Sequence, residues 1–192
     1  MRCNVLLVSS SEKGAAAISS LISDDKYYPV VTADSVSHAQ MLCEAGSYDL
    51  IIVNAPLSDD FGAEFAVKKS LEQTCSVIMV ANENIIRKLS AKVSKYGILV
   101  TKKPIDVSAF GVCLDLACAM ISRYKKLEAQ NEELKEKLSE VKLVERAKNV
   151  LMECLKMTEP QAHRYLEKQA MDMRVTKKEA AGSVIRTYTD SY

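Results

Sequence analysis

The chain has 192 residues, of which 48% are hydrophobic and 27% are charged. These proportions are ordinary for a soluble globular protein, and the length suits one domain of common size plus a smaller one. The charge is uneven: residues 1–120 carry 11 basic and 13 acidic side chains, residues 121–141 carry 5 of each, and residues 142–192 carry 10 and 7. This mild basic excess at the C-terminal end does not identify a nucleic-acid partner by itself.

Secretion, membrane insertion and metal binding are not predicted. The apolar run from Val5 to Val8 is too short for a signal sequence, and no apolar stretch approaches the length of a membrane span. The six cysteines form no C-x-x-C pair, and His38 and His163 are far from any cysteine cluster. We therefore predict a cytoplasmic protein with free thiols, no metal site and no cofactor.

Short apolar segments alternate with amphipathic segments in the first 120 residues. The predicted strands are residues 4–10, 29–33, 48–56, 76–81 and 97–104, and the predicted helices are residues 12–23, 35–46, 61–72, 83–95 and a segment that starts near Val107. Most of these strands are apolar throughout, which indicates burial on both faces of a parallel sheet with right-handed crossovers. The prediction is a doubly wound α/β domain with a five-stranded parallel sheet. Its functional cleft is expected at the C-terminal strand ends. The residues at those ends are Ser9, Ser10, Asn54, Ala81 and Lys103.

From about residue 107 the pattern is helical, and a heptad repeat follows over residues 120–141. Its core positions are Met120, Tyr124, Leu127, Asn131, Leu134, Leu138 and Val141. This spacing predicts a coiled-coil linker helix, and Asn131 at an a position favours a parallel homodimer in which two Asn131 side chains meet. The predicted dimerisation residues are Leu127, Asn131, Leu134 and Leu138. The alternative is one long amphipathic helix that packs on its own domain.

Residues 142–192 predict an all-α domain of three helices. Two helix starts carry capping boxes, at Thr158 with Gln161 and at Thr176 with Glu179. Stripes of apolar residues, rich in alanine, follow each start and permit close helix approach. A domain of roughly 50 residues is marginal for independent stability, so continuity with the linker helix is expected to support it.

The N-terminal domain, residues 1–119, resembles a response-regulator receiver domain, which implies a flavodoxin-like (CheY-like) fold. Receivers carry an acidic pair after the first strand, an aspartate that ends the third, a threonine or serine that ends the fourth, and Lys-Pro after the fifth. In this sequence only Lys103-Pro104 matches. The resemblance places the acidic pair at Ser9-Ser10, the phosphoacceptor at Asn54 and the hydroxyl residue at Ala81.

These substitutions remove the phosphorylation chemistry that the resemblance implies. Aspartyl phosphorylation needs a carboxylate nucleophile and a magnesium ion held by carboxylates, whereas Asn54 is an uncharged amide. We therefore predict a degenerate pseudo-receiver that is not phosphorylated and is controlled by a sensor or ligand-binding partner protein, or by a ligand. Two roles remain open for Lys103: a hydrogen bond to Asn54 or to a backbone carbonyl, or an anchor for a small anionic ligand.

The C-terminal domain resembles an ANTAR domain. The match consists of Ala147-Lys148, Leu151-Met152, Ala162, Tyr165, Leu166, Ala170-Met171, Arg174 and Ala181. The family usually has an aromatic residue directly after the first alanine of the second helix, where this sequence has His163. The resemblance implies transcription antitermination, in which the domain binds paired hairpin loops of a nascent leader RNA and so prevents a terminator hairpin.

Recognition of RNA loops needs cations for phosphates and planar side chains for unstacked bases. The candidate RNA-binding cations are Lys148, Arg174, Lys177, Lys178, Arg146, Arg164, Lys168 and Arg186. Tyr165 and Tyr188 lie on apolar faces and are expected in the core rather than against bases. The alternatives are a DNA-binding response regulator and a protein–protein adaptor. An enzyme is not expected, because the sequence has no nucleophile–base pair, metal cluster or glycine-rich phosphate loop.

Overall fold

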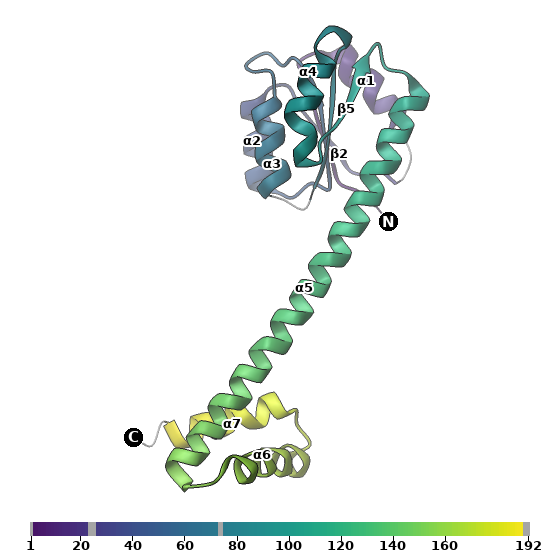
Figure 1. The fold of residues 1–192 in the computed structure, drawn as a ribbon. Coiled ribbons are helices and arrows are strands. Elements are labelled where there is room, and N and C mark those ends of the chain that lie inside the picture. The colour runs from purple at the N-terminus through teal and green to yellow at the C-terminus, as the bar shows by residue number, and fades with distance from the viewer. Residues whose placement is uncertain (1, 23–25, 73–74, 190–192) are drawn as a thin grey trace. The chain divides into compact units, whose positions relative to one another are not determined.

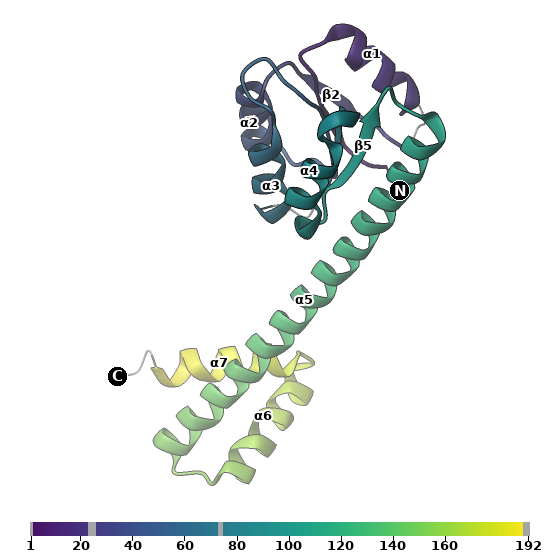
Figure 2. The ribbon, with the colours of Figure 1, turned by 45° about the horizontal axis from the view of Figure 1, so that its top comes forward.

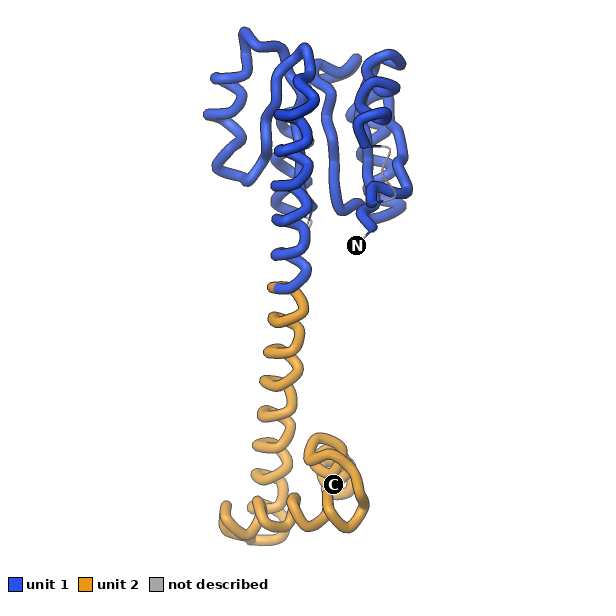
Figure 3. The backbone as a smooth tube through the Cα atoms, turned by 90° about the vertical axis from the view of Figure 1, so that its right-hand side faces the viewer, with its two compact units in different colours: residues 1–126 blue, residues 127–192 orange. Residues whose placement is uncertain are grey.

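The computed structural model describes residues 2–22, 26–72 and 75–189. The chain forms two compact units, residues 1–126 and residues 127–192 (Figure 3). The boundary between them lies within the predicted linker helix, residues 120–141. The predicted domain borders near residues 120 and 142 both fall inside α5 (Val107–Leu155), which is helical without interruption.

Unit 1 contains the predicted five-stranded parallel sheet. Its strands are β1 (Val5–Val8), β2 (Val30–Ala33), β3 (Leu50–Asn54), β4 (Ser76–Asn82) and β5 (Leu99–Lys103), in the order β2-β1-β3-β4-β5. The intervening helices are α1 (Glu12–Leu21), α2 (Val36–Ala45), α3 (Ala63–Glu72) and α4 (Glu83–Val93), followed by the short 3-10 helix η1 (Ser94–Tyr96). This is the predicted flavodoxin-like fold.

Helices cover both faces of this sheet (Figures 1 and 2). On one face α1 and the first part of α5 contribute Ile18, Phe110, Leu114 and Ile121 to a buried cluster. On the other face α2, α3 and α4 form a second cluster with the alternate side chains of the strands. Because successive strand residues point to opposite faces, strands buried on both sides are mostly apolar: β1 is apolar throughout, and β3 is apolar up to its last residue, Asn54.

The first part of α5 is more apolar than the sequence analysis expected. The helix contains an 18-residue stretch of mean hydropathy 1.4, so by length and composition alone it could cross a membrane, and 22% of that stretch is buried. Burial of Phe110, Leu114 and Ile121 against the sheet explains part of this apolar character, whereas Val112 and Leu116 remain exposed. A helix that covers a sheet needs an apolar inner face, because that face is buried against the strands.

Unit 2 packs the last part of α5 against α6 (Glu159–Met173) and α7 (Lys177–Thr189) (Figure 1). Its core consists of Ala147, Leu151, Ala162, Leu166, Ala181 and Val184. Both predicted capping boxes are present: the Thr158 N–H donates to Gln161 Oε1 at 2.8 Å, and the Thr176 N–H donates to Glu179 Oε2 at 2.8 Å. Arg174, with φ of 53°, ends α6 in the left-handed conformation.

Candidate functional sites

The residues predicted at the strand ends of unit 1 are partly brought together. Asn54, which is only 6% exposed, donates from Nδ2 to Ser9 Oγ at 2.9 Å, and the Ser9 hydroxyl donates to the Ser11 carbonyl at 3.0 Å. Lys103 Nζ donates to the Ala55 carbonyl at 2.6 Å, and burial lowers the pKa of Lys103. The lysine thus makes the backbone hydrogen bond of the first of its two predicted roles. Ser10 is exposed and Ala81 is fully buried.

The first turn of α1 closes directly over Asn54. A methyl group added at Gly14 would lie 2.4 Å from Asn54 Nδ2 and 3.3 Å from Ser9 Oγ, so a side chain at this position would have to displace the Asn54 amide. Glycine therefore allows the first turn of α1 to pack directly on Asn54 and Ser9. Gly14 was not among the residues predicted for this site.

The donor set at these strand ends does not fit a magnesium ion. Ser9, Ser10 and Asn54 include no carboxylate, whereas Mg²⁺ sites usually contain one or two. The nearby carboxylates are engaged elsewhere. Asp59 accepts the N–H groups of Val36 and Ser37 at the start of α2, and Asp60 accepts the Gly62 N–H at 2.6 Å. Asp49 lies at the opposite end of β3, where it pairs with Lys125 at 2.7 Å. The backbone hydrogen bonds of Val36 and Ser37 lower the pKa of Asp59.

In unit 2, Lys148 differs from the other predicted RNA-binding cations because it is buried. It is 6% exposed, and its Nζ lies 2.7 Å from Glu145 and 2.8 Å from Glu159. These two hydrogen bonds raise the pKa of Lys148. A lysine with two carboxylate partners has little charge to offer a phosphate. We assign it the role of joining α5 to the start of α6. Its contact with RNA stays a prediction.

This assignment predicts a pH window for the effect of Lys148→Met. The Lys148 hydrogen bond lowers the pKa of Glu159, so that contribution to stability exists above the unfolded pKa of about 4.3 and is lost as the pH falls through the folded value. The raised pKa of Lys148 makes its own contribution complete below the unfolded value of about 10.4 and lost as the pH rises through the folded value. Urea unfolding followed by loss of helix should therefore show the greatest loss of stability of Lys148→Met, relative to the natural chain, between about pH 5 and pH 10. The same change at exposed Lys168 should show no such window; a pH-independent loss at position 148 would indicate packing alone.

The other predicted cations of unit 2 are exposed, but one of them is paired. Lys177 Nζ lies 2.8 Å from Glu167, a carboxylate that also contacts His163 at 3.3 Å. The exposed cations for which the described part of the chain shows no ion pair are Arg146, Arg164, Lys168, Arg174, Lys178 and Arg186.

A single face of α6 gathers two of these cations beside an exposed methionine. Arg164, Lys168 and Met171 follow i, i+4, i+7 spacing, and Met171 is 78% exposed. Arg174 caps the C-terminal end of the same helix, and Lys178 lies in the first turn of α7. We call Arg164, Lys168, Met171, Arg174 and Lys178 the α6 surface. Met171 was part of the ANTAR match but was not predicted as a contact residue, although its place outside the i, i+3, i+4 core stripe of α6 was a usable signal.

Tyr165 and Tyr188 occupy the core position that was expected of them. Both are half-buried and pack against the cluster of unit 2. Burial and a hydrogen bond with Tyr188 raise the pKa of Tyr165. The aromatic rings are therefore turned toward the protein interior, and the α6 surface offers a methionine rather than a planar ring.

The predicted dimerisation residues form an exposed apolar line on the part of α5 that belongs to unit 2. The exposed fractions of Leu127, Leu134 and Leu138 are 50%, 66% and 55%, and that of Val141 is 58%. Asn131 is exposed as well. Within the described part of unit 2, none of the three leucines belongs to the hydrophobic core.

Comparison with known proteins agrees with both halves of this description. Residues 132–185 match the ANTAR domain. For unit 1, a signal receiver domain of an HD domain-containing protein from Pseudomonas fluorescens has a TM-score of 0.58 and 23% identity, over 65% of this chain and 93% of that one. A two-component response regulator from Clostridium difficile has a TM-score of 0.51 and 16% identity, over 64% and 98%.

The chain thus combines a unit with the receiver fold and a later segment that matches the ANTAR domain. Over most of its length it is similar to the transcriptional regulatory protein PdtaR of Mycobacterium tuberculosis. The two are 26% identical over 174 residues, which cover 88% of this chain and 83% of PdtaR.

Proposed function

We propose that this protein is a cytoplasmic, non-enzymatic transcription antitermination regulator that binds paired hairpin loops of a leader RNA as a parallel homodimer. The observation that carries the proposal is the ANTAR match over residues 132–185, which spans α6 and most of α7. The similarity to a transcriptional regulatory protein supports the same function.

The α6 surface is the proposed RNA contact. Arg164, Lys168, Arg174 and Lys178 supply cations for loop phosphates, and Met171 supplies an apolar contact for an unstacked base. Two copies of this surface in a dimer would engage two hairpins of one transcript, so the second binding event becomes intramolecular. Occupied hairpin loops would then be unavailable to a competing terminator hairpin.

The receiver-fold domain is proposed to respond to a partner protein or a ligand rather than to phosphate. Asn54 offers an amide in place of a carboxylate, and Gly14 packs directly on it. Both features oppose formation of an acyl phosphate at this position.

The test is a titration of the protein with a two-hairpin leader RNA in the presence of duplex DNA of equal charge. Binding should survive the DNA, and Arg174→Asn/Lys178→Gln should weaken it by about tenfold or more and reduce the slope of log K against log salt by about one to two. Asparagine suits the left-handed backbone at position 174, so the variant removes charge without straining the end of α6.

Lys13→Gln/Arg87→Gln serves as the matched control, because both positions are exposed and lie in unit 1. It should leave RNA affinity unchanged. Equal, salt-sensitive binding of RNA and DNA would show only general charge attraction, and preference for DNA would favour a DNA-binding regulator. Absence of binding to both would favour a protein–protein adaptor.

A further inference from the structure

A groove between α3 and α4 of unit 1 has no part in the function proposed so far. It consists of two adjoining hollows of 360 and 460 Å³ that share Ala63, Glu64 and Lys92. The α3 wall extends from Ala63 to Leu71, which is about 12 Å at 1.5 Å per residue. That length accommodates two to three turns of a docked helix and exceeds what a compact small molecule needs.

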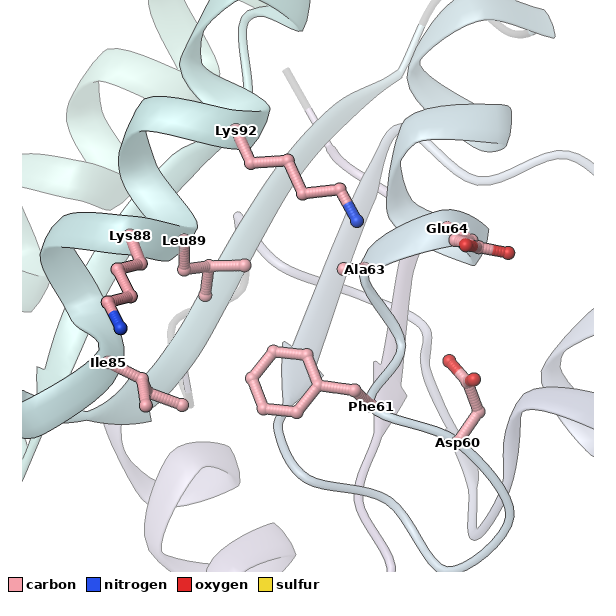
Figure 4. Close-up of a pocket in the computed structure, with 8 residues that line it drawn as sticks. All are labelled: Asp60, Phe61, Ala63, Glu64, Ile85, Lys88, Leu89 and Lys92. Atoms are coloured by element: carbon pink, nitrogen blue, oxygen red, sulfur yellow. The ribbon is translucent and has the colours of Figure 1, made fainter.

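The floor of the groove is apolar. In the first hollow Ile85 and Leu89 stand on α4, and the ring of Phe61, from the loop before α3, points toward them, as Figure 4 shows. The second hollow adds Val67 and Leu71, and the side chain of Leu71 is 67% exposed. Exposed apolar side chains that line a concave surface favour a partner with apolar side chains of its own.

The α4 wall is basic. Lys88 and Lys92 are one helical turn apart, Lys95 follows in η1, and Lys68 stands on α3. In Figure 4 the Lys92 side chain extends from α4 over the groove, while the carboxylates of Asp60 and Glu64 lie on the far side. For Lys88 and Lys92 the described residues include no carboxylate within ion-pair distance.

The charge of the groove is opposite to that of its domain. Its lining contains four lysines against Asp60 and Glu64, whereas residues 1–120 carry more acidic than basic side chains, 13 against 11. An unpaired basic wall over an apolar floor complements a helix with one apolar face and flanking carboxylates.

We propose that the α3–α4 groove is the docking site for an acidic amphipathic helix of a partner protein. Apolar side chains at i, i+3 or i+4, and i+7 would enter the two hollows, and carboxylates beside them would pair with Lys88, Lys92 and Lys95. The proposal deepens the control of the receiver-fold domain by a partner protein and rests on that part of the proposed function, but it does not depend on RNA binding.

The experiment uses the full chain and a library of displayed peptides of about 16 residues, enough for about four helical turns. Peptides selected on the natural protein are counter-selected on Lys88→Glu/Lys92→Glu, and their affinities are measured by fluorescence anisotropy. The enriched sequences should combine Asp or Glu with Leu-type residues at helical spacing. The charge-reversed variant should lower the affinity of these peptides by about tenfold or more. Leu71→Ser, which leaves the lysines intact, should also lower their affinity.

Lys13→Glu/Arg87→Glu is the matched control: the same charge reversal at exposed positions outside the groove should leave peptide affinity intact. The proposal is overturned if no enriched peptide depends on Lys88 and Lys92, or if scrambled peptides of the same composition bind equally well. It is also overturned if a two-hairpin RNA displaces the peptides and loses affinity in the Lys88→Glu/Lys92→Glu variant. RNA binding by the natural protein is measured on the same preparation, so failure of the proposed RNA function remains separable.

Discussion

Leu134→Ser/Leu138→Ser should convert the protein from a dimer into a folded monomer at micromolar concentration. Both side chains are more than half exposed in the single chain, so their removal deletes few contacts within the protomer. In a parallel coiled coil the same side chains would be buried at d and a positions, where each leucine contributes about 1.5–3 kcal/mol. The variant removes four leucines per dimer, and the free energy lost would exceed the total stability of a coiled coil of about three heptads.

Loss of the dimer should also weaken binding to a two-hairpin RNA by about 10² to 10⁴, because each hairpin would then be bound independently. Affinity for a single hairpin should change little, since the α6 surface is intact. Sedimentation equilibrium gives the mass, and titrations with one-hairpin and two-hairpin RNAs give the two affinities.

Ala129→Ser/Glu136→Ser is the control for helix propensity. Both are f positions, in the heptads that begin at Tyr124 and Asn131, and lie on the outside of the predicted coiled coil. This variant should remain a dimer. An unchanged mass for Leu134→Ser/Leu138→Ser would contradict the coiled-coil dimer and favour the alternative that α5 is only a long amphipathic helix.

The fold was predictable because its signals are local. Uniformly apolar strands such as Val5–Val8 and the capping box at Thr158 each depend on a few neighbouring residues, and the structure contains both. The absence of carboxylates at Ser9 and Asn54 was also visible in the sequence. What the sequence did not contain is the approach of Gly14 to Asn54, because that contact depends on how α1 settles over β3.

The candidate site in unit 2 was less predictable for a similar reason. A lysine in a helix is usually solvated, which favoured a surface position for Lys148. Its spacing of four residues from Val144 and three from Leu151 placed it on the apolar face of the helix, unlike Arg146, and was a usable signal. Its burial arises because Lys156, with φ of 54°, turns the chain after α5 and brings Glu159 to the lysine. The α3–α4 groove likewise depends on how two helices separated by β4 pack side by side, although the spacing of Lys88, Lys92 and Lys95 was available as a signal.

Asn54→Asp should lower stability without restoring phosphorylation. The new carboxylate would replace a side chain that is 6% exposed, with one neighbouring hydroxyl at Ser9, while Lys103 is hydrogen-bonded to the Ala55 carbonyl. A buried charge with a single hydrogen-bond partner costs about 2–4 kcal/mol at pH 8. The N-terminal turn of α1 offsets only about 0.3–1 kcal/mol of this. With Ser9 and Ser10 unable to hold magnesium, a small acyl phosphate should give no phosphoprotein in either the natural chain or the variant.

The sign of the pH dependence distinguishes this explanation from loss of packing. Burial should raise the folded pKa of the new carboxyl group above its unfolded value of about 3.9, so stability falls as the pH rises between the two values and is constant above both. Urea unfolding of Asn54→Asp should therefore approach that of the natural chain near pH 4. Asn54→Ala, which also loses the Ser9 hydrogen bond but introduces no charge, should show a deficit that does not vary with pH. Magnesium-dependent phosphorylation of Asn54→Asp, detected as an 80 Da mass increase (about the mass of one added phosphoryl group), would show that α1 can move away from residue 54 and that the pocket retains receiver chemistry.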